Sequence, residues 1–219
     1  MNKIIVWAFS WAPPFAQGLV RDLRVRWALE EAGLTYETRL IDFDDRNSPA
    51  YLQRQPFGQI PACELDGHTL FESGAIVHRI ASGFEVLLPH DRGRSADTVT
   101  WMFAALNTVE PPIQNLLTLD LLHGEEQWAQ LRRPGAVDAV MVRLDALAAW
   151  LDGRDYLVDR FTAADILMAT VLRLIRHTDL VAGNATLAAY LERCESRPAF
   201  QKALREQMAD YARNAPAAA

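Results

Sequence analysis

The residues with the clearest chemical potential lie near the end of the first third of this 219-residue chain. Asp66-Gly67 stands between two alternating runs, Ala62 to Leu65 and His68 to Phe71. A two-residue Asp-Gly turn is the strongest short-range signal of a β-hairpin, because a type I′ turn needs a positive φ at both central residues. The stretch therefore predicts two antiparallel strands.

Two features flank this hairpin and together describe a pocket for an extended, peptide-like ligand. Pro61 precedes the first strand, where a cis peptide bond would turn the chain and leave the backbone of Ile60 free to pair with a ligand. Glu72 and Ser73 follow the second strand at the start of a predicted helix. The free N–H groups and the positive dipole end of a helix favour a carboxylate, Ser73 adds a hydroxyl, and Glu72 adds an acid for an amine.

A carboxylate and an ammonium on one carbon, followed by an extended amide chain, describe the γ-glutamyl end of glutathione. At this point the chain resembles the glutathione transferase superfamily. The resemblance runs from Lys3-Ile4-Ile5-Val6 through Phe161-Thr162-Ala163-Ala164-Asp165 to about Leu204. In that family the Ile-Pro step pairs with the cysteinyl backbone of glutathione and the Glu-Ser pair holds its γ-glutamyl group.

The resemblance implies a binding role for several residues of this chain. Glutathione is the implied co-substrate, and the implied contacts are Ile60, Pro61, Glu72 and Ser73, with Gln59 beside them and Arg46 for the glycyl carboxylate. The second substrate would be a small hydrophobic electrophile, and its candidate contacts are Trp11, Phe15, Asn107 and Pro111. No metal is required by this chemistry, and the family resemblance implies a homodimer.

Glutathione attacks as a thiolate, so an enzyme must lower a thiol pKa near 8.5 by about two units, worth roughly 2.7 kcal/mol. In the family the donor is a Tyr, Ser or Cys after the first strand or at the start of the first helix. Ser10 is the only hydroxyl between Met1 and Leu34 and is therefore the catalytic candidate. The segment that separates Ser10 from Arg24-Val25-Arg26 is longer than in members with a catalytic Ser, so three other donors stay open: Trp11 Nε1–H, Gln17 and a backbone N–H near Phe15.

Alternative functions follow from the same features. The unusual first loop also fits a non-catalytic module that binds a partner protein through its surface. Glutathione-dependent isomerisation, dehalogenation or disulfide reduction are further options, although the absence of an N-terminal Cys weakens a mixed-disulfide mechanism.

The composition restricts the partners. A net charge of -6 and the lack of a basic block argue against nucleic acid or an anionic membrane as a partner. The apolar run at the N-terminus is too short for a signal peptide and no stretch is long enough for a membrane span, so we expect a cytoplasmic protein.

The two cysteines, Cys63 and Cys194, are far apart and are expected to be small buried hydrophobes. The five histidines show no ligand-type spacing, so no metal site is predicted.

The elements that must position these residues can be predicted from the pattern. Four elements are predicted before the hairpin, in chain order: a strand over 3–9, a helix from Leu19 to Ala32, a strand over 36–41 and a Ser48-capped helix to Leu52. A helix over 73–81 follows the hairpin. The order β-α-β-α-β-β-α is that of a thioredoxin-like domain, here residues 1–83. We expect a linker at 84–94, a C-terminal all-helical bundle domain at 95–213 and a frayed tail at 214–219.

Three sequence features predict the structure of the helical domain. Pro111-Pro112 should kink or break a helix that spans residues 99–113. A further helix is expected from Ala136 to Leu151, with one apolar face in the core. Thr162 to Asp165 is a capping box before an apolar run, and we expect it to be structural.

Overall fold

The structure is a computed structural model that describes residues 3–216, so positions 217–219 of the predicted frayed tail lie outside the described residues. The chain forms two compact units. The first runs to Leu87 and includes the C-terminal helix α9 (Pro198–Arg213), and the second spans Leu88–Arg197. The domain boundaries given above stay a prediction.

The first unit is built on a mixed sheet of four strands in the order β2-β1-β3-β4. Strands β1 (Ile5–Phe9) and β2 (Glu37–Ile41) are parallel, and β3 (Ala62–Leu65) runs antiparallel to both β1 and β4 (His68–Phe71). The crossover between β1 and β2 contains α1 (Asp22–Glu31), and α3 (Ser73–Ala81) follows β4. This arrangement confirms the predicted thioredoxin-like fold.

Local sequence signals account for several of these elements. Asp66 and Gly67 have φ of 54° and 80°, as the predicted hairpin turn requires. The side chain of Ser48 accepts a hydrogen bond from the N–H of Tyr51, so it caps α2 (Pro49–Leu52) as expected. The Ile60–Pro61 bond is cis, the form that would leave the Ile60 backbone free for a ligand.

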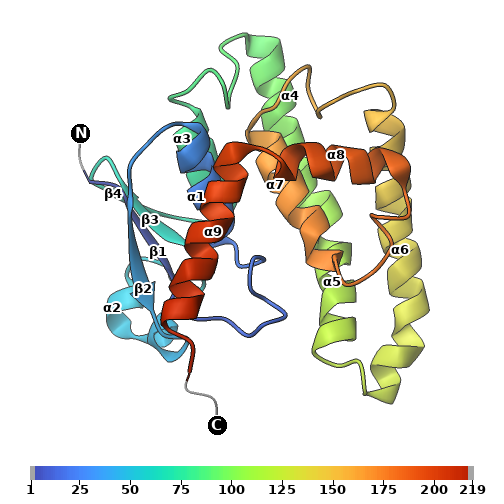
Figure 1. Ribbon diagram of the computed structural model, residues 1–219, viewed down its shortest axis with the longest axis horizontal. Coiled ribbons are helices and arrows are strands. Elements are labelled where there is room, and N and C mark those ends of the chain that lie inside the picture. The colour runs from blue at the N-terminus through green and yellow to red at the C-terminus, as the bar shows by residue number, and fades with distance from the viewer. Residues whose placement is uncertain (1–2, 217–219) are drawn as a thin grey trace. The chain divides into compact units, whose positions relative to one another are not determined.

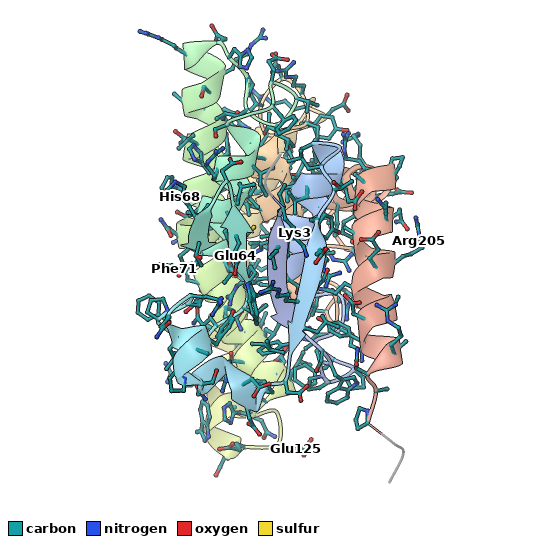
Figure 2. All side chains as sticks on the ribbon, turned by 90° about the vertical axis from the view of Figure 1, so that its left-hand side faces the viewer. Lys3, Glu64, His68, Phe71, Glu125 and Arg205 are labelled. Atoms are coloured by element: carbon teal, nitrogen blue, oxygen red, sulfur yellow. The ribbon has the colours of Figure 1, made fainter. Side chains whose placement is uncertain are left out.

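The first helix begins later than its apolar pattern suggests. The pattern starts at Leu19, but α1 begins at Asp22 and residues 14–19 form turns. Gly18, directly before this pattern, has a φ of 75°, which a right-handed helix does not allow, and the turn continues through Leu19. Helix α9 packs against α1 (Figure 1). Figure 2 shows His68 and Phe71 on the edge strand β4, and Arg205 on the side of α9 that faces away from the sheet.

The second unit is helical in its regular elements, which are listed here: α4 (Arg92–Phe103), η2 (Ala104–Val109), α5 (Glu110–Leu121), α6 (Gln127–Leu151), α7 (Ala163–Leu172), η3 (Arg173–Ile175) and α8 (Ala185–Glu195). The predicted break at Pro111-Pro112 takes the form of η2, a π-helical segment that ends two residues before Pro111. The wider π turn is a common response to a disturbed hydrogen-bond ladder, and both prolines lack the N–H that the ladder needs.

The start of α6 was predicted wrongly. The helix begins at Gln127 and contains Pro134, whereas the sequence pattern placed its start at Ala136. Tertiary contacts hold these early turns, because Arg133 donates two hydrogen bonds to Asp120 of α5 at 2.7 and 3.1 Å. Of the apolar face predicted for α6, Val140, Leu144, Leu147 and Leu151 are buried, whereas Val137 and Met141 are half-buried.

The capping box at α7 is confirmed. The N–H of Thr162 donates to Asp165 Oδ2 at 2.8 Å, and Asp165 Oδ1 accepts from the N–H of Leu157 at 3.1 Å and from Tyr190 Oη at 3.0 Å. Burial raises the pKa of Asp165 to about 6 despite these hydrogen bonds. Within residues 3–216 no helix is both long enough and apolar enough to cross a bilayer.

Candidate functional site

The register of the sheet brings the predicted glutathione contacts together at one end. Trp7 of β1 pairs with Ala62 of β3, and Ala62 pairs in turn with Phe71 of β4. Because both pairs are antiparallel, the loop after β1, the Ile60-Pro61 step and the Glu72-Ser73 step all leave the sheet at the same end. Chain segments that are far apart in sequence thus meet at a single place.

Ile60 combines an anchored side chain with a free backbone. Its side chain is buried in a cluster with Tyr51 and Ala62. Tyr51 Oη donates to the carbonyl of Gln59 at 2.7 Å, which fixes the chain just before the cis bond. The N–H and carbonyl of Ile60 make no hydrogen bond with any residue that the structure describes. An extended ligand can therefore pair with this edge.

Glu72 and Ser73 form the N-terminus of α3 in an unusual conformation. Glu72 has φ 65° and ψ 113°, a region that costs a non-glycine residue on the order of 1–3 kcal/mol and is enriched at functional sites. The strained backbone turns the chain directly into the helix, so the open N–H groups of its first turn point out of the end of the sheet described above. The Glu72 side chain is exposed and makes no capping hydrogen bond.

A buried arginine supports Ser73. Arg24 is 2% exposed and Ser73 is 5% exposed, and Arg24 Nη1 donates to Ser73 Oγ at 3.2 Å. Since the Ser73 oxygen accepts this hydrogen bond, its own hydroxyl hydrogen remains for another acceptor. The guanidinium also adds positive charge beside the positive end of the helix dipole. The pair is suited to hold a carboxylate.

Arg46 lies next to the chain segment that leads to Ile60. The short 3₁₀ segment η1 (Asp44–Asn47) packs so closely on Gly58 that a Cβ there would lie 3.2 Å from the carbonyl oxygen of Arg46. The Arg46 guanidinium lies over the ring of Phe43, 3.8 Å from its centroid. Its Nε is buried and has no hydrogen-bond partner among residues 3–216. A buried, unpaired guanidinium nitrogen is a ready partner for an anion.

The loop between β1 and α1 places Ser10 differently from the expectation of a free donor. Ser10 Oγ donates to Asp42 Oδ1 at 2.6 Å, and the Ser10 N–H donates to the carbonyl of Ile41 at 2.8 Å. This hydrogen bond uses the single hydrogen of the Ser10 hydroxyl and links the end of β1 to the end of β2. Gln17 Nε2 donates to the carbonyl of Ala12 at 2.9 Å.

Other donors in this loop are open. The indole N–H of Trp11 has no hydrogen-bond partner in the described part of the chain, and the same holds for the backbone N–H of Phe15. The loop is held at both ends next to Ile60, because Phe9 and Val20 pack against the cluster that contains it. Phe15 is exposed and presents an apolar ring.

Two of the remaining sequence candidates, Asn107 and Pro111, lie in the second unit. Asn107 is exposed in η2, and Pro111 is exposed at the start of α5. Their assignment to a substrate site stays a prediction. Burial raises the pKa of Cys63 to about 12, which makes this thiol a packing residue, as expected. The described residues contain no group of three or more His, Cys, Asp and Glu side chains that could hold a metal ion.

Sequence reasoning missed Arg24 and Asp42, the direct partners of Ser73 and Ser10. Arg24 left a signal, because it lies between Leu23 and Val25 in a helix that is buried from Asp22 to Leu29. A charged residue in such a position needs a buried partner. Asp42 gave no such signal, because an acidic residue after a partly exposed strand is common.

Comparison with known proteins decides the family. The N-terminal domain model of glutathione S-transferases matches residues 17–82, and the C-terminal domain model matches residues 126–198. Glutathione S-transferase 3 of Zea mays is 32% identical over 195 residues, which cover 82% of this chain and 86% of that protein. The chain belongs to the glutathione S-transferase family. The predicted family, fold class and glutathione transferase function are thereby confirmed.

Solved structures agree with this assignment. The transferase is similar to glutathione transferase F7 of Populus trichocarpa, with 26% identity, a TM-score of 0.80, and coverage of 94% of this chain and 99% of that one. It is also similar to a glutathione transferase of Burkholderia graminis, with 27% identity, a TM-score of 0.80, and coverage of 92% and 87%. That crystal structure has two glutathione molecules bound per subunit.

Proposed function

We propose that the first unit binds glutathione along the end of its sheet and activates the thiol for attack on a small hydrophobic electrophile. The observation that carries this proposal is the meeting of a free Ile60 backbone, the open N-terminus of α3 and the unpaired Arg46 Nε at one end of the sheet. These groups match the amide, the γ-glutamyl carboxylate and the glycyl carboxylate of the tripeptide in turn.

Each part of glutathione then has a partner. The N–H and carbonyl of Ile60 pair with the cysteinyl residue, while the cis Pro61 keeps them turned to the ligand. Ser73 Oγ and the first N–H groups of α3 hold the γ-glutamyl carboxylate, and Glu72 holds its ammonium. Arg46 binds the glycyl carboxylate, with the exposed Gln59 side chain beside it.

Activation of the thiol falls to the loop from Ser10 to Gln17. In the Ser10–Asp42 hydrogen bond the serine hydroxyl offers only lone pairs, which stabilise a thiol rather than a thiolate. Ser10 can act as the donor once its hydrogen turns away from Asp42, whereas the free N–H groups of Trp11 and Phe15 need no such change. We therefore propose that Trp11 Nε1–H and the Phe15 N–H stabilise the thiolate, and that Ser10 braces the loop.

The proposal also covers the second substrate, the cellular role and the oligomeric state. The electrophile is apolar and contacts Trp11 and Phe15 of the first unit, and the reaction detoxifies such compounds in the cytoplasm. The functional form is a homodimer. Support for the dimer comes from Phe57, which is 69% exposed, and its neighbour Phe71, with 6.1 Å between the ring centroids. Light scattering tests this, because the native chain should have twice the monomer mass and Phe57→Ser should have the monomer mass.

Disulfide reduction is the second candidate, favoured by the two glutathione molecules bound to the similar Burkholderia graminis protein. One glutathione thiolate would attack a disulfide sulfur, form a mixed disulfide and release one thiol. The second glutathione would release the other thiol and form glutathione disulfide. No protein cysteine takes part, which agrees with the buried Cys63 and Cys194.

Parallel assays separate the two reactions. The purified protein is given glutathione and either an activated aryl chloride or a small dialkyl disulfide, and the thioether or the glutathione disulfide is measured. Conjugation at the higher kcat/KM supports the first proposal, and turnover of the disulfide alone supports the second. Absence of both activities, with glutathione bound, would favour the non-catalytic module.

A further inference from the structure

The C-terminal helix α9 contacts the segment between the candidate activating loop and α1 through one buried side chain. Gln207 is fully buried, and its Nε2 donates to the carbonyl of Val20 at 3.2 Å and to Asp22 Oδ1 at 2.7 Å. Val20 follows the candidate activating loop, residues 10–17, and Asp22 is the first residue of α1. One amide thus joins α9 to the place where the loop becomes a helix.

An ionic chain continues this contact into the helix. Asp22 Oδ2 accepts from Arg26 Nε at 2.8 Å, and Arg26 Nη2 donates to Asp210 of α9 at 2.7 Å. All three side chains are buried, and burial raises the pKa of Asp22. The first turn of α1 is therefore held on α9 by hydrogen bonds from two directions.

The amide of Gln207 is not the group that packing alone would favour. Its Oε1 is buried and accepts no hydrogen bond within residues 3–216. A buried acceptor without a partner costs free energy, which an apolar side chain of the same size would avoid. The stabilising contacts of this side chain are the hydrogen bonds that its Nε2 donates to Val20 and Asp22.

The position of Val20 matters because of what it contacts. Its side chain packs against the cluster that includes Ile60, whose backbone is the proposed partner of the cysteinyl residue. We propose that Gln207 is a positioning residue, which holds Val20 and thereby sets the distance between the thiol-activating donors of the loop and the glutathione sulfur. This inference rests on the proposed function of the loop.

The test measures thiol activation and glutathione binding separately. In Gln207→Leu the bound thiol pKa, followed by the ultraviolet absorbance of the thiolate, should rise by about one unit, and kcat at neutral pH should fall about tenfold. The affinity for S-methylglutathione, which has no ionisable thiol, should stay within about twofold because Ile60, Glu72 and Ser73 are untouched.

Lys202→Ala is the matched control. Lys202 Nζ donates to Glu30 Oε2 at 2.7 Å, so this variant removes a contact between α9 and the opposite end of α1. The control should leave the thiol pKa unchanged. An equal pKa shift in both variants, or no shift in Gln207→Leu, overturns the positioning role.

Two further arms keep the result decisive. If Gln207→Leu does not fold, Gln207→Asn replaces it, because its shorter side chain does not reach both acceptors and should also raise the thiol pKa.

The wild type distinguishes a failure of the proposed thiol activation from a failure of the role of Gln207. A wild type that binds glutathione without lowering its thiol pKa refutes the proposed activation itself, whereas a normal wild type with an unaffected variant refutes only the role of Gln207.

Discussion

Replacement of Ser73 by Ala should weaken both glutathione binding and the fold. The hydroxyl hydrogen of Ser73 is free to donate because its oxygen accepts from Arg24. A hydrogen bond to a charged group contributes about 1.5–3 kcal/mol, which corresponds to a factor of about 10 to 150 in Kd. We expect Ser73→Ala to raise the Kd for glutathione at least about tenfold, and the loss of an acceptor for buried Arg24 to lower stability by about 1–3 kcal/mol.

Ser82→Ala is the control for this prediction, because Ser82 lies at the other end of α3, where its Oγ donates to the carbonyl of Arg79 at 2.8 Å. Calorimetric titration of glutathione into each variant gives the Kd, and thermal unfolding checks the fold. Cysteinylglycine, which lacks the γ-glutamyl group, should bind equally to wild type and Ser73→Ala. The reasoning is refuted if Ser73→Ala binds glutathione as tightly as Ser82→Ala, or if it loses affinity for cysteinylglycine to the same extent.

Three further predictions address the other groups. Arg46→Ala should raise the Kd for glutathione about tenfold and leave that for its glycyl ethyl ester unchanged in calorimetry, since the ester lacks the carboxylate; equal losses for both ligands would contradict the assigned contact. Trp11→Phe should raise the pKa of the bound thiol by about one unit and Ser10→Ala should not, as read from the thiolate absorbance; the reverse result would restore Ser10 as the donor. The raised pKa of Asp165 favours its protonated form in the fold, so its contribution is complete below about pH 4 and is lost as pH rises through about 6. Urea unfolding should therefore show wild-type stability falling by about 3 kcal/mol relative to Asp165→Asn between these pH values, and a parallel pH dependence of the two proteins would contradict it.

Local signals in the sequence were sufficient for most of the fold. The Asp66-Gly67 turn, the Ser48 cap and the Thr162 capping box each depend on residues close together in the chain, so the chemistry of a few side chains determines them. The same holds for the start of α3 at Ser73. Ser73 belongs to the candidate site, so the local structure at this part of the site could be predicted.

Features that depend on distant contacts could not be predicted. Gln207 and Val20 are far apart in sequence, and nothing near either residue announces their hydrogen bond. Pro134 indicates a helix boundary by local rules, but the pairing of Arg133 with Asp120 outweighs it. The state of Ser10 is likewise set by Asp42, whose position follows from the pairing of β1 with β2.

The pKa of the glutathione thiol in the complex tests the central claim most directly. Glutathione is titrated into the wild-type protein by calorimetry, and the ultraviolet thiolate band of the complex is followed as the pH is varied. We predict binding together with a thiol pKa about two units below the value of about 8.5 for a free thiol. Binding with an unshifted thiol pKa, or no binding at millimolar concentrations, would contradict the account.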